Sequence, residues 1–383
     1  MRPPKGTPRL PASLSSLILL ISASVPLAAT EPSLTDDSQC DCYLTNGNRS
    51  SYFTEHRFFD FRSLSEYAGV PPIIRDPDAT ADADETSAFF TTPAWTDFWM
   101  LGSWNNSRGG VRSDATALMV NSPNNVYIEA SSDPDPSSQT FLTLRTQRVT
   151  RDFQTAAEIE SVSAKFKYLS LRARMRTRGA AGAVTAMFAY RGADTLAGVQ
   201  ESDLEVRTAD PRTLVHYTNQ PSYTDDGDVI AQATRNATLP AGRAWSDWAV
   251  HRMDWTPRAT TWFVDGVPVA QIDFQVPRDE CNVILNAWGD GGGWTGNMSA
   301  GDAAYLQVQW LEIVFNSTEP RDGGDGDGDR VCHAVCSIDR TTQLGTPVML
   351  WDNAASGRMW DLVGWLSMGV AMLVMLVSTG LVV

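Results

Sequence analysis

Three carboxylates alternate along one short stretch of the chain, Glu201, Asp203 and Glu205. On a β-strand, successive side chains point to opposite faces, so these acids would share one face while Ser202 and Leu204 share the other. Three acids on one face repel one another and would destabilise a purely structural sheet. Sugar hydrolysis requires such a group, because a retaining glycosidase uses one carboxylate as nucleophile and another, about 5–5.5 Å away, as general acid. Alternating acids also occur on solvated strand or helix faces, so the run alone does not decide between a catalytic and a solvated face.

The segments around the acids are typical of strands and hairpins. An apolar run, 186–190, precedes the acids, and 214–220 mixes β-forming residues with polar ones. A second pair of runs ends in Asp265-Gly266, a dipeptide typical of hairpin turns. Short β-rich runs separated by turn residues predict an all-β fold, a two-sheet antiparallel sandwich. The predicted strands are 126–130, 141–146, 157–161, 166–176, 184–190, 201–207, 213–218, 248–255, 260–265, 268–274, 282–287 and 304–315.

The acidic run and the segments around it resemble those of glycoside hydrolase family 16, the β-glucanase and transglycosylase family. The resemblance extends over roughly 56–316 and implies a concanavalin A-like jelly roll whose concave face forms the substrate cleft. It is carried by the acidic run and by HRMDWTPRATTWFVDG at 251–266, ILNAWGDGGGWTG at 284–296, SPNNVYIEA at 122–130, FLTLRT at 141–146 and YLSLRARMRT at 168–177.

The resemblance implies a role for each acid. Glu201 would be the nucleophile that forms a covalent glycosyl-enzyme, Glu205 the general acid and base, and Asp203 the residue that tunes Glu201. The single residue between Asp203 and Glu205 resembles the lichenase, xyloglucan-transferase and fungal transglycosylase branch more than the laminarinase branch. Ser202 stands where many relatives carry an aliphatic residue; we expect it to face the core and to change only packing.

Sugar-binding residues are also implied by the resemblance. Side chains that match cleft positions in relatives are Tyr217, Asn219, Asn286, Trp288 and Trp294. The two tryptophans could instead fill the core. An early cluster of Trp95, Trp99 and Trp104 could wall the cleft or fill the sandwich, with Trp99 expected in the core. We expect His251 to support the sheet rather than to take part in the reaction.

Both ends of the 383-residue chain have the composition of processing segments. Residues 1–29 read as a secretory signal peptide, with basic residues before an apolar core and small residues at its end. The domain predicted at 56–318 follows a cysteine-containing segment, 30–55, and precedes an acidic linker and cysteine segment at 319–358. The apolar tail, 359–383, has the layout of a glycosylphosphatidylinositol signal, with a retained transmembrane helix as the alternative. Both interpretations predict a secreted protein held at the outer cell surface.

In a secreted protein, N-glycosylation sequons can be modified and cysteines can form disulfides. N-glycosylation is predicted at Asn48, Asn105, Asn236, Asn297 and Asn316. Four of the five cysteines, Cys40, Cys42, Cys332 and Cys336, flank the domain, so disulfides should join the two terminal segments. The fifth, Cys281, would take one partner or remain free. Zinc is not supported by any tetrahedral set of ligands. The alternating Asp and Gly of 322–329 reads as an acidic linker, with a calcium site as the alternative.

Together these observations predict a retaining endo-acting glycoside hydrolase that acts on β-glucan-type cell-wall polysaccharide and requires no cofactor. The net charge of −15 excludes a nucleic-acid partner, because no basic stripe is available to contact phosphates. A transglycosylase would use the same residues, with a sugar hydroxyl, chitin included, as acceptor. Secretion and the lipid-anchor signal resemble a fungal surface protein that remodels wall glucan. A lectin-like binder or a structural surface protein could have the same fold, but neither needs three acids.

Overall fold

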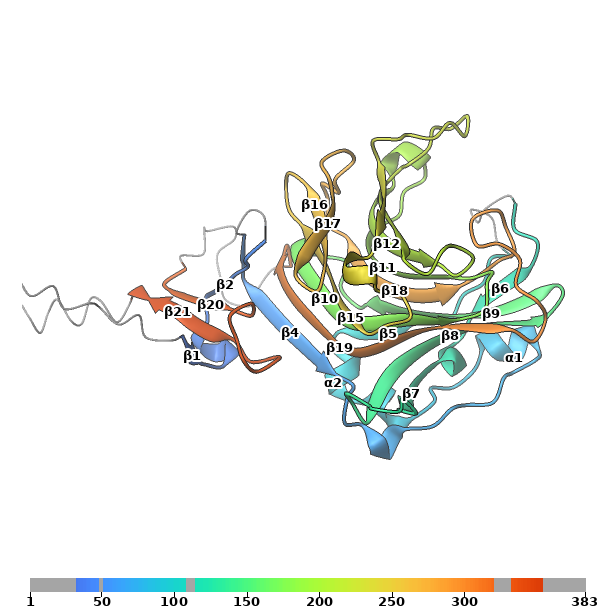
Figure 1. The fold of residues 1–383 in the computed structure, drawn as a ribbon, viewed down its shortest axis with the longest axis horizontal. Helices are drawn as coiled ribbons and strands as arrows, with labels where there is room; N and C mark the ends of the chain where they lie inside the picture. The colour runs from blue at the N-terminus through green and yellow to red at the C-terminus, as the bar shows by residue number, and fades with distance from the viewer. Residues whose placement is uncertain (1–31, 48–50, 108–113, 320–331, 354–383) are drawn as a thin grey trace, which may run out of the picture.

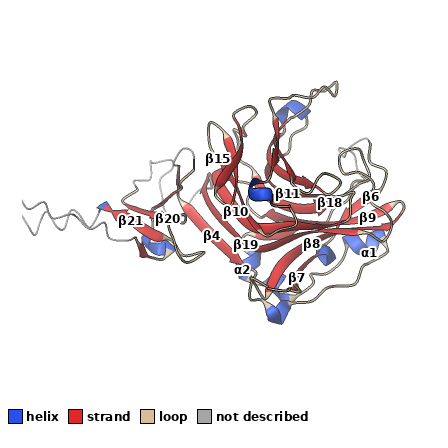
Figure 2. Cartoon of the chain, viewed as in Figure 1, coloured by secondary structure: helices blue, strands red, loops and turns tan. Residues whose placement is uncertain are grey.

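The computed structural model describes residues 32–47, 51–107, 114–319 and 332–353. Within these ranges the chain is nearly all β, and two curved layers of antiparallel strands dominate the molecule (Figures 1 and 2). Each predicted strand overlaps an observed one, so the predicted all-β sandwich is confirmed. The predicted signal peptide at 1–29, the stretch 322–329 and the apolar tail at 359–383 lie outside the described residues.

The first layer, called here the β12 sheet, contains the acidic run. Its strands lie in the order β14-β13-β12-β11-β18-β9 and are antiparallel throughout, while β5 and β6 pair with β9 at the far edge. The bounds are β14 Thr234–Thr238, β13 Leu214–Gln220, β12 Gln200–Arg207, β11 Val184–Arg191, β18 Asn282–Trp288, β9 Phe153–Ser161, β5 Trp99–Leu101 and β6 Leu118–Asn121.

The second layer, called here the β10 sheet, is joined to the first through the pairing of β8 with β9. Its strands lie in the order β8-β19-β10-β15-β16-β17, with β7 beside β8 and β4 beside β19. The bounds are β7 Val126–Ala130, β8 Thr140–Thr150, β19 Ala303–Ser317, β4 Glu55–Asp60, β10 Phe166–Gly179, β15 Ala249–Trp255, β16 Thr260–Val264 and β17 Val267–Ile272.

Helices are short and lie in the connections. Proline begins both α-helices, and the Asp76 side chain accepts from two backbone N–H groups at the start of α1, a common N-cap. No helix in the described part of the chain is long and apolar enough to cross a membrane. The bounds are α1 Pro77–Ala81, α2 Pro93–Thr96, η1 Asp37–Gln39, η2 Ser65–Tyr67, η3 Ala88–Thr91, η4 Pro123–Asn125, η5 Leu196–Gly198 and η6 Pro240–Gly242.

The hydrophobic core lies between the two sheets. Leu204 and Val206 of β12 enter it from one side, while Trp255 and Trp262 enter it from the other. The alternation of these strands is therefore apolar toward the core and polar on the opposite face, as expected for a sandwich in which one face of each sheet is buried. The acids of β12 must then project from the outer face of their sheet.

The two ends of the described chain form a separate five-stranded sheet, called here the terminal sheet, which lies beside β4 at one end of the molecule (Figure 1). Its order is β1-β21-β20-β2-β3, and β2 runs parallel to β20. Disulfides Cys40–Cys336 and Cys42–Cys332 join the N-terminal strands to the C-terminal ones, which confirms the predicted link. The bounds are β1 Ser33–Leu34, β2 Cys42–Leu44, β3 Tyr52–Phe53, β20 Ala334–Ser337 and β21 Val348–Asp352.

Cys281 takes no disulfide partner; it is buried in the core beside Phe166. Burial raises the pKa of its thiol to about 12, so the reactive thiolate is scarce at neutral pH. The odd cysteine is therefore a packing residue.

A buried cluster of charges joins the terminal sheet to the outer face of the β10 sheet. His56 of β4 lies 2.8 Å from Asp37 and 3.3 Å from the buried Glu312 of β19. Although burial opposes the charged imidazole, hydrogen bonds to these two carboxylates raise the pKa of His56. Arg172 of β10 lies between Glu312, at 4.0 Å, and Asp339, at 2.9 Å. Positive and negative groups thus alternate across the contact.

Asp339 is the centre of this cluster. Its carboxylate also accepts from Arg252 of β15 at 3.3 Å and from the backbone N–H of Asn46 at 2.7 Å. Arg252 in turn forms a two-bond pair with Asp254, at 2.6 and 2.7 Å. One carboxylate therefore neutralises two arginines, and its removal would leave both without a shared counter-ion in a water-poor contact.

We expect Asp339→Ala to lower the free energy of unfolding by about 3 kcal/mol, because it removes the carboxylate nearest to Arg172 and one of the two that neutralise Arg252. Urea unfolding followed by tryptophan fluorescence measures the change. Asp225→Ala, in an exposed loop, is the matched control and should be neutral. Equal stability of the two variants would show that the cluster does not hold the terminal sheet.

Candidate active site

The three acids lie on the outer face of β12, as the alternation predicts. Across the pairing with β11, Glu201 lies opposite Tyr190, Asp203 opposite Phe188 and Glu205 opposite Ala186. The register runs without a shift along the whole strand. Asp203 and Glu205 are therefore separated by one residue without a bulge, and this geometry keeps all three acids on one face.

Burial and mutual repulsion change the acidity of these groups. Burial, with the charge of Glu205 added, raises the pKa of Glu201 to about 7, although a hydrogen bond from Asp203 works in the opposite direction. Burial, followed by repulsion from Glu201 and Glu205, raises the pKa of Asp203 well above its usual range. The hydrogen bond favours the carboxylate form of Glu201 and the protonated form of Asp203, so the two share one proton.

Asp203 is held from a second side by the neighbouring strand. Gln220 of β13 donates from Nε2 to Asp203 Oδ2 at 3.3 Å. Register places Gln220 opposite Glu201 and Thr218 opposite Asp203, so both share the acidic face. Gln220 was not singled out from the sequence, although its position in the alternation of β13 gives it this face.

A cleft of about 430 Å³ opens along the outer face of the β12 sheet beside Glu201. Asn286 and Trp288 of β18 line it, as predicted, and Phe188, Tyr190 and Trp104 add aromatic surface. Aromatic faces and amide groups together suit the apolar faces and hydroxyl groups of pyranose rings.

Two further acids of the cleft, Glu158 and Glu160 of β9, were not predicted from the sequence. Burial raises the pKa of Glu158 to about 7, while hydrogen bonds from Trp104 and Asn286 lower it. The Trp104 indole donates to Glu158 Oε1 at 2.6 Å. The available signal was the alternation of Glu158 and Glu160 in the run 157–161, but only the pairing of β9 with β18 brings them to the cleft.

Tyr217 and Asn219 do not line the cleft, which corrects the prediction for both. Register puts Tyr217 opposite Leu204 and Asn219 opposite Ser202, on the core face. Tyr217 is fully buried, with its ring 5.4 Å from that of Trp262. Asn219 accepts from Ser202 at 2.7 Å and donates to the Phe274 carbonyl at 2.9 Å. These side chains support β12 from its core face.

Ser202 faces the core as expected and makes a polar link between the two sheets. Its hydroxyl lies 2.9 Å from Thr260 Oγ1 of β16, in addition to its bond with Asn219. An aliphatic residue here would leave the Asn219 oxygen without this donor in a dry interior. The departure from the family pattern is therefore compensated by matching polar partners.

Of the other tryptophans singled out from the sequence, two lie in the core, one lines the cleft and one lies in the loop after β18. Trp95 and Trp99 are buried in the core, whereas Trp104 is 43 % exposed in the cleft. Trp294, in the loop after β18, donates from its indole nitrogen to Glu205 Oε1 at 3.3 Å. This hydrogen bond connects the loop after β18 to Glu205.

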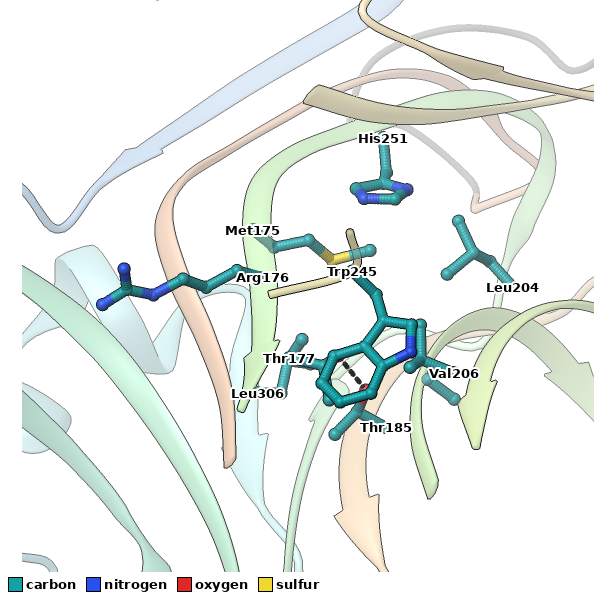
Figure 3. Close-up of a pocket in the computed structure, with 10 residues that line it drawn as sticks. Met175, Arg176, Thr177, Thr185, Leu204, Val206, Trp245, His251 and Leu306 are labelled. Carbon is teal, nitrogen blue, oxygen red and sulfur yellow. Dashed lines mark hydrogen bonds between the residues drawn. The ribbon is translucent and has the colours of Figure 1, made fainter. Parts of the chain in front are cut away.

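His251 lies in the interior, behind the acidic strand. It lines a small cavity of about 10 Å³ between the sheets, together with Leu204, Trp245 and Thr185 (Figure 3). Burial lowers the pKa of His251 to about 4, so the ring is neutral at ordinary pH. The cavity is too small for a sugar, and His251 supports the sheet as expected.

The described sequon asparagines reach the surface to different degrees. Asn236 and Asn297 are exposed, while Asn105 and Asn316 are partly covered; Asn48 lies outside the described residues. Asn236 Oδ1 lies 2.9 Å from His216 Nδ1, on the acidic side of the β12 sheet. Glycosylation of these asparagines stays a prediction. Within the described ranges, no group of three His, Cys, Asp or Glu side chains is placed to hold a metal ion.

Comparison with known proteins gives a family match at this region. The sequence model described as "Glycosyl hydrolases family 16" matches residues 117–312, which contain all three acids and the strands that carry them. The match covers half of the chain.

Individual relatives are more distant. The chain is similar to a β-glucanase of Paenibacillus polymyxa, at 23% identity over 137 residues, 35% of this chain and 54% of that protein, so the match spans about half the relative's length. Among solved structures, the Bacillus licheniformis β-glucanase has a TM-score of 0.44 at 20% identity, covering 57% of this chain and 92% of that one. An endo-β-1,3-glucanase from Pyrococcus furiosus has a TM-score of 0.46 at 17% identity, covering 72% and 99%.

The raised pKa of Glu201 predicts a stability that depends on pH. Its folded pKa, about 7 against an ordinary 4.5, means that the folded state binds more protons in this window, so stability falls as pH rises through it. Glu201→Gln removes this cost and should stabilise the protein by about 1–3 kcal/mol at pH 8. Thermal unfolding at pH 4 and pH 8 measures it; a gain that is the same at both pH values would contradict a buried, shared proton.

Proposed function

Because the chain belongs to glycosyl hydrolase family 16, we propose that it is a retaining endo-acting glycoside hydrolase that cleaves β-glucan through a covalent glycosyl-enzyme. The observation that carries the proposal is the placement of Glu201, Asp203 and Glu205 on one face of β12, beside a cleft lined by aromatic and amide side chains. The similarity to a β-glucanase of Paenibacillus polymyxa agrees with this substrate class.

In the proposed first step, Glu201 attacks the anomeric carbon of the bound sugar. The bond to the glycosidic oxygen breaks, and Glu205 donates its proton to that oxygen as it leaves. Asp203 supports the attack, because its shared proton lets Glu201 act as a carboxylate despite burial. The charge that Glu201 loses on forming the ester relieves the repulsion with its neighbours.

In the second step, Glu205 takes a proton from an incoming hydroxyl, whose oxygen attacks the anomeric carbon and releases Glu201. Water gives hydrolysis, and a sugar hydroxyl gives transglycosylation. Both reactions use the same intermediate, so product analysis separates them. Shortened oligosaccharides mean hydrolysis, whereas lengthened or hybrid ones mean transfer.

We further propose that the domain acts outside the cell and is held at the membrane surface by the apolar tail. The two disulfides and the predicted sequons support an oxidising, extracellular location. The small residues at 353–357 before the tail support a lipid anchor over a retained helix.

Substitution of the two glutamates should distinguish their roles. Glu201→Ala should abolish cleavage of β-1,3, β-1,4 and mixed-linkage oligosaccharides, and Glu205→Ala should reduce it by about 10²–10⁴-fold. With an activated aryl glycoside, Glu205→Ala should recover with azide and give a β-glycosyl azide, because the glycosyl-enzyme still forms. Mass spectrometry and NMR identify the products, with the exposed Glu66→Gln as control. Wild-type turnover in either alanine variant, or tight binding without products in all proteins, would refute the proposal.

The anchor has its own test in cells that express the full chain. Phosphatidylinositol-specific phospholipase C should release the protein from the surface into the medium, because the lipid would be its only attachment. Immunoblotting of both fractions measures release. Retention after the lipase, with release by detergent only, would favour a transmembrane helix.

A further inference from the structure

Trp294 is enclosed by charged and aromatic side chains rather than open to the cleft on both faces. The Arg207 guanidinium lies 4.5 Å from its ring centroid, over one face. The His216 ring meets it at 68°, with centroids 5.3 Å apart. A tryptophan that stacks on sugar needs a free ring face, and Arg207 occupies one of the two. Its indole N–H points instead at Glu205.

Both neighbours of Trp294 are fixed by further bonds. Arg207 Nε donates to the backbone carbonyl of Trp294 at 2.8 Å, and its Nη1 lies 3.6 Å from Asp210. His216 Nε2 lies 2.6 Å from the same Asp210 oxygen, and its Nδ1 lies 2.9 Å from Asn236 Oδ1. Asp210 therefore contacts both Arg207, which lies over the indole face, and His216, which lies at the indole edge.

The strand register places this cluster next to the acid that it contacts. Glu205 lies opposite His216 on β13, and Arg207 follows two residues after Glu205 on the same face of β12. Trp294 comes from the loop after β18, and one strand, β11, lies between β18 and the strand that carries Glu205. The Trp294 indole contacts the carboxyl oxygen directly, and Arg207 and His216 contact the indole ring.

We propose that Arg207, His216 and Trp294 form a positioning unit for Glu205, in which Arg207 and His216 fix the indole and the indole N–H holds the carboxyl at Oε1. The inference rests on the proposed function, in which Glu205 is the general acid and base. The unit favours the charged form of the Glu205 carboxyl over its neutral form. A donor on Oε1 stabilises the carboxylate, and a cation over the indole face strengthens that donor. The unit therefore opposes the repulsion between Glu201 and Glu205.

The test is the pH dependence of kcat/KM on oligoglucosides with a sugar leaving group, measured for Trp294→Phe and Arg207→Met in the full chain. Trp294→Phe keeps an aromatic ring and removes the N–H, so the alkaline limb should move up by about one pH unit, with kcat reduced about tenfold and KM little changed. Arg207→Met should move the limb in the same direction by less. Trp288→Phe, on the cleft wall, is the matched control and should change KM without moving the limb.

A second measurement guards against a merely structural loss. A β-glycosyl fluoride needs little acid assistance, so the Trp294→Phe protein should form its glycosyl-enzyme at close to the wild-type rate if the site is folded. An unmoved limb in both variants, or a rise in KM alone, would overturn the positioning unit and return Trp294 to sugar stacking. A slow fluoride reaction combined with an unmoved limb would overturn it as well. Full activity of Glu205→Ala would instead refute the proposed function itself, so the two failures are distinguishable.

Discussion

The proton shared by Glu201 and Asp203 is the constraint on which the site depends. Two buried carboxyl groups two residues apart on a strand cannot both be charged without a large cost, so one must hold a proton for the other. The remainder of the sheet makes this state persist. Gln220 fixes Asp203 from the next strand, and Trp294 contacts the third acid from a loop. On a surface helix, water would screen the charges of the same acids, and their pKa values would differ little from one another.

The rigidity that this sharing needs comes from the core face of the same strand. Leu204 and Val206 anchor β12 in the hydrophobic core, and Ser202 bonds across the sandwich to Thr260. Each acid therefore alternates with a residue whose position is fixed by packing or by a buried hydrogen bond. The strand cannot slip by one residue without exposing its apolar side chains and burying all three acids in the core.

Sequence alternation was enough to assign Glu201, Asp203 and Glu205 to one face, because every second residue of a strand points to the same side whatever its neighbouring strands are. The prediction that failed, for Tyr217 and Asn219, came from the resemblance, and the pairing of β13 with β12 puts both side chains on the core face. Val215 alternates in step with these two residues and indicated the core face, but the resemblance matched Tyr217 and Asn219 to cleft positions. Glu158 was missed, since its alternation with Glu160 gives the two acids one face, but only pairing with β18, more than a hundred residues away, brings that face to the cleft. The cysteines predicted the link between the chain ends, whereas the charge cluster around Asp339 depends on tertiary packing that no spacing reveals.

The terminal sheet has a consequence for how the protein is made. Strand β2 pairs with β20 in parallel, and the disulfide partners of Cys40 and Cys42 are separated from them by 296 and 290 residues. During synthesis, strands β1 to β3 therefore remain with two unpaired thiols and an open sheet edge until Cys332 and Cys336 have emerged. A ribosome that stops early would release a product with unpaired thiols and an unpaired strand, both of which retention machinery can bind in the secretory pathway proposed for this protein. Under that proposal, closure of the terminal sheet acts as a check that synthesis has passed Cys336 before the protein leaves the cell.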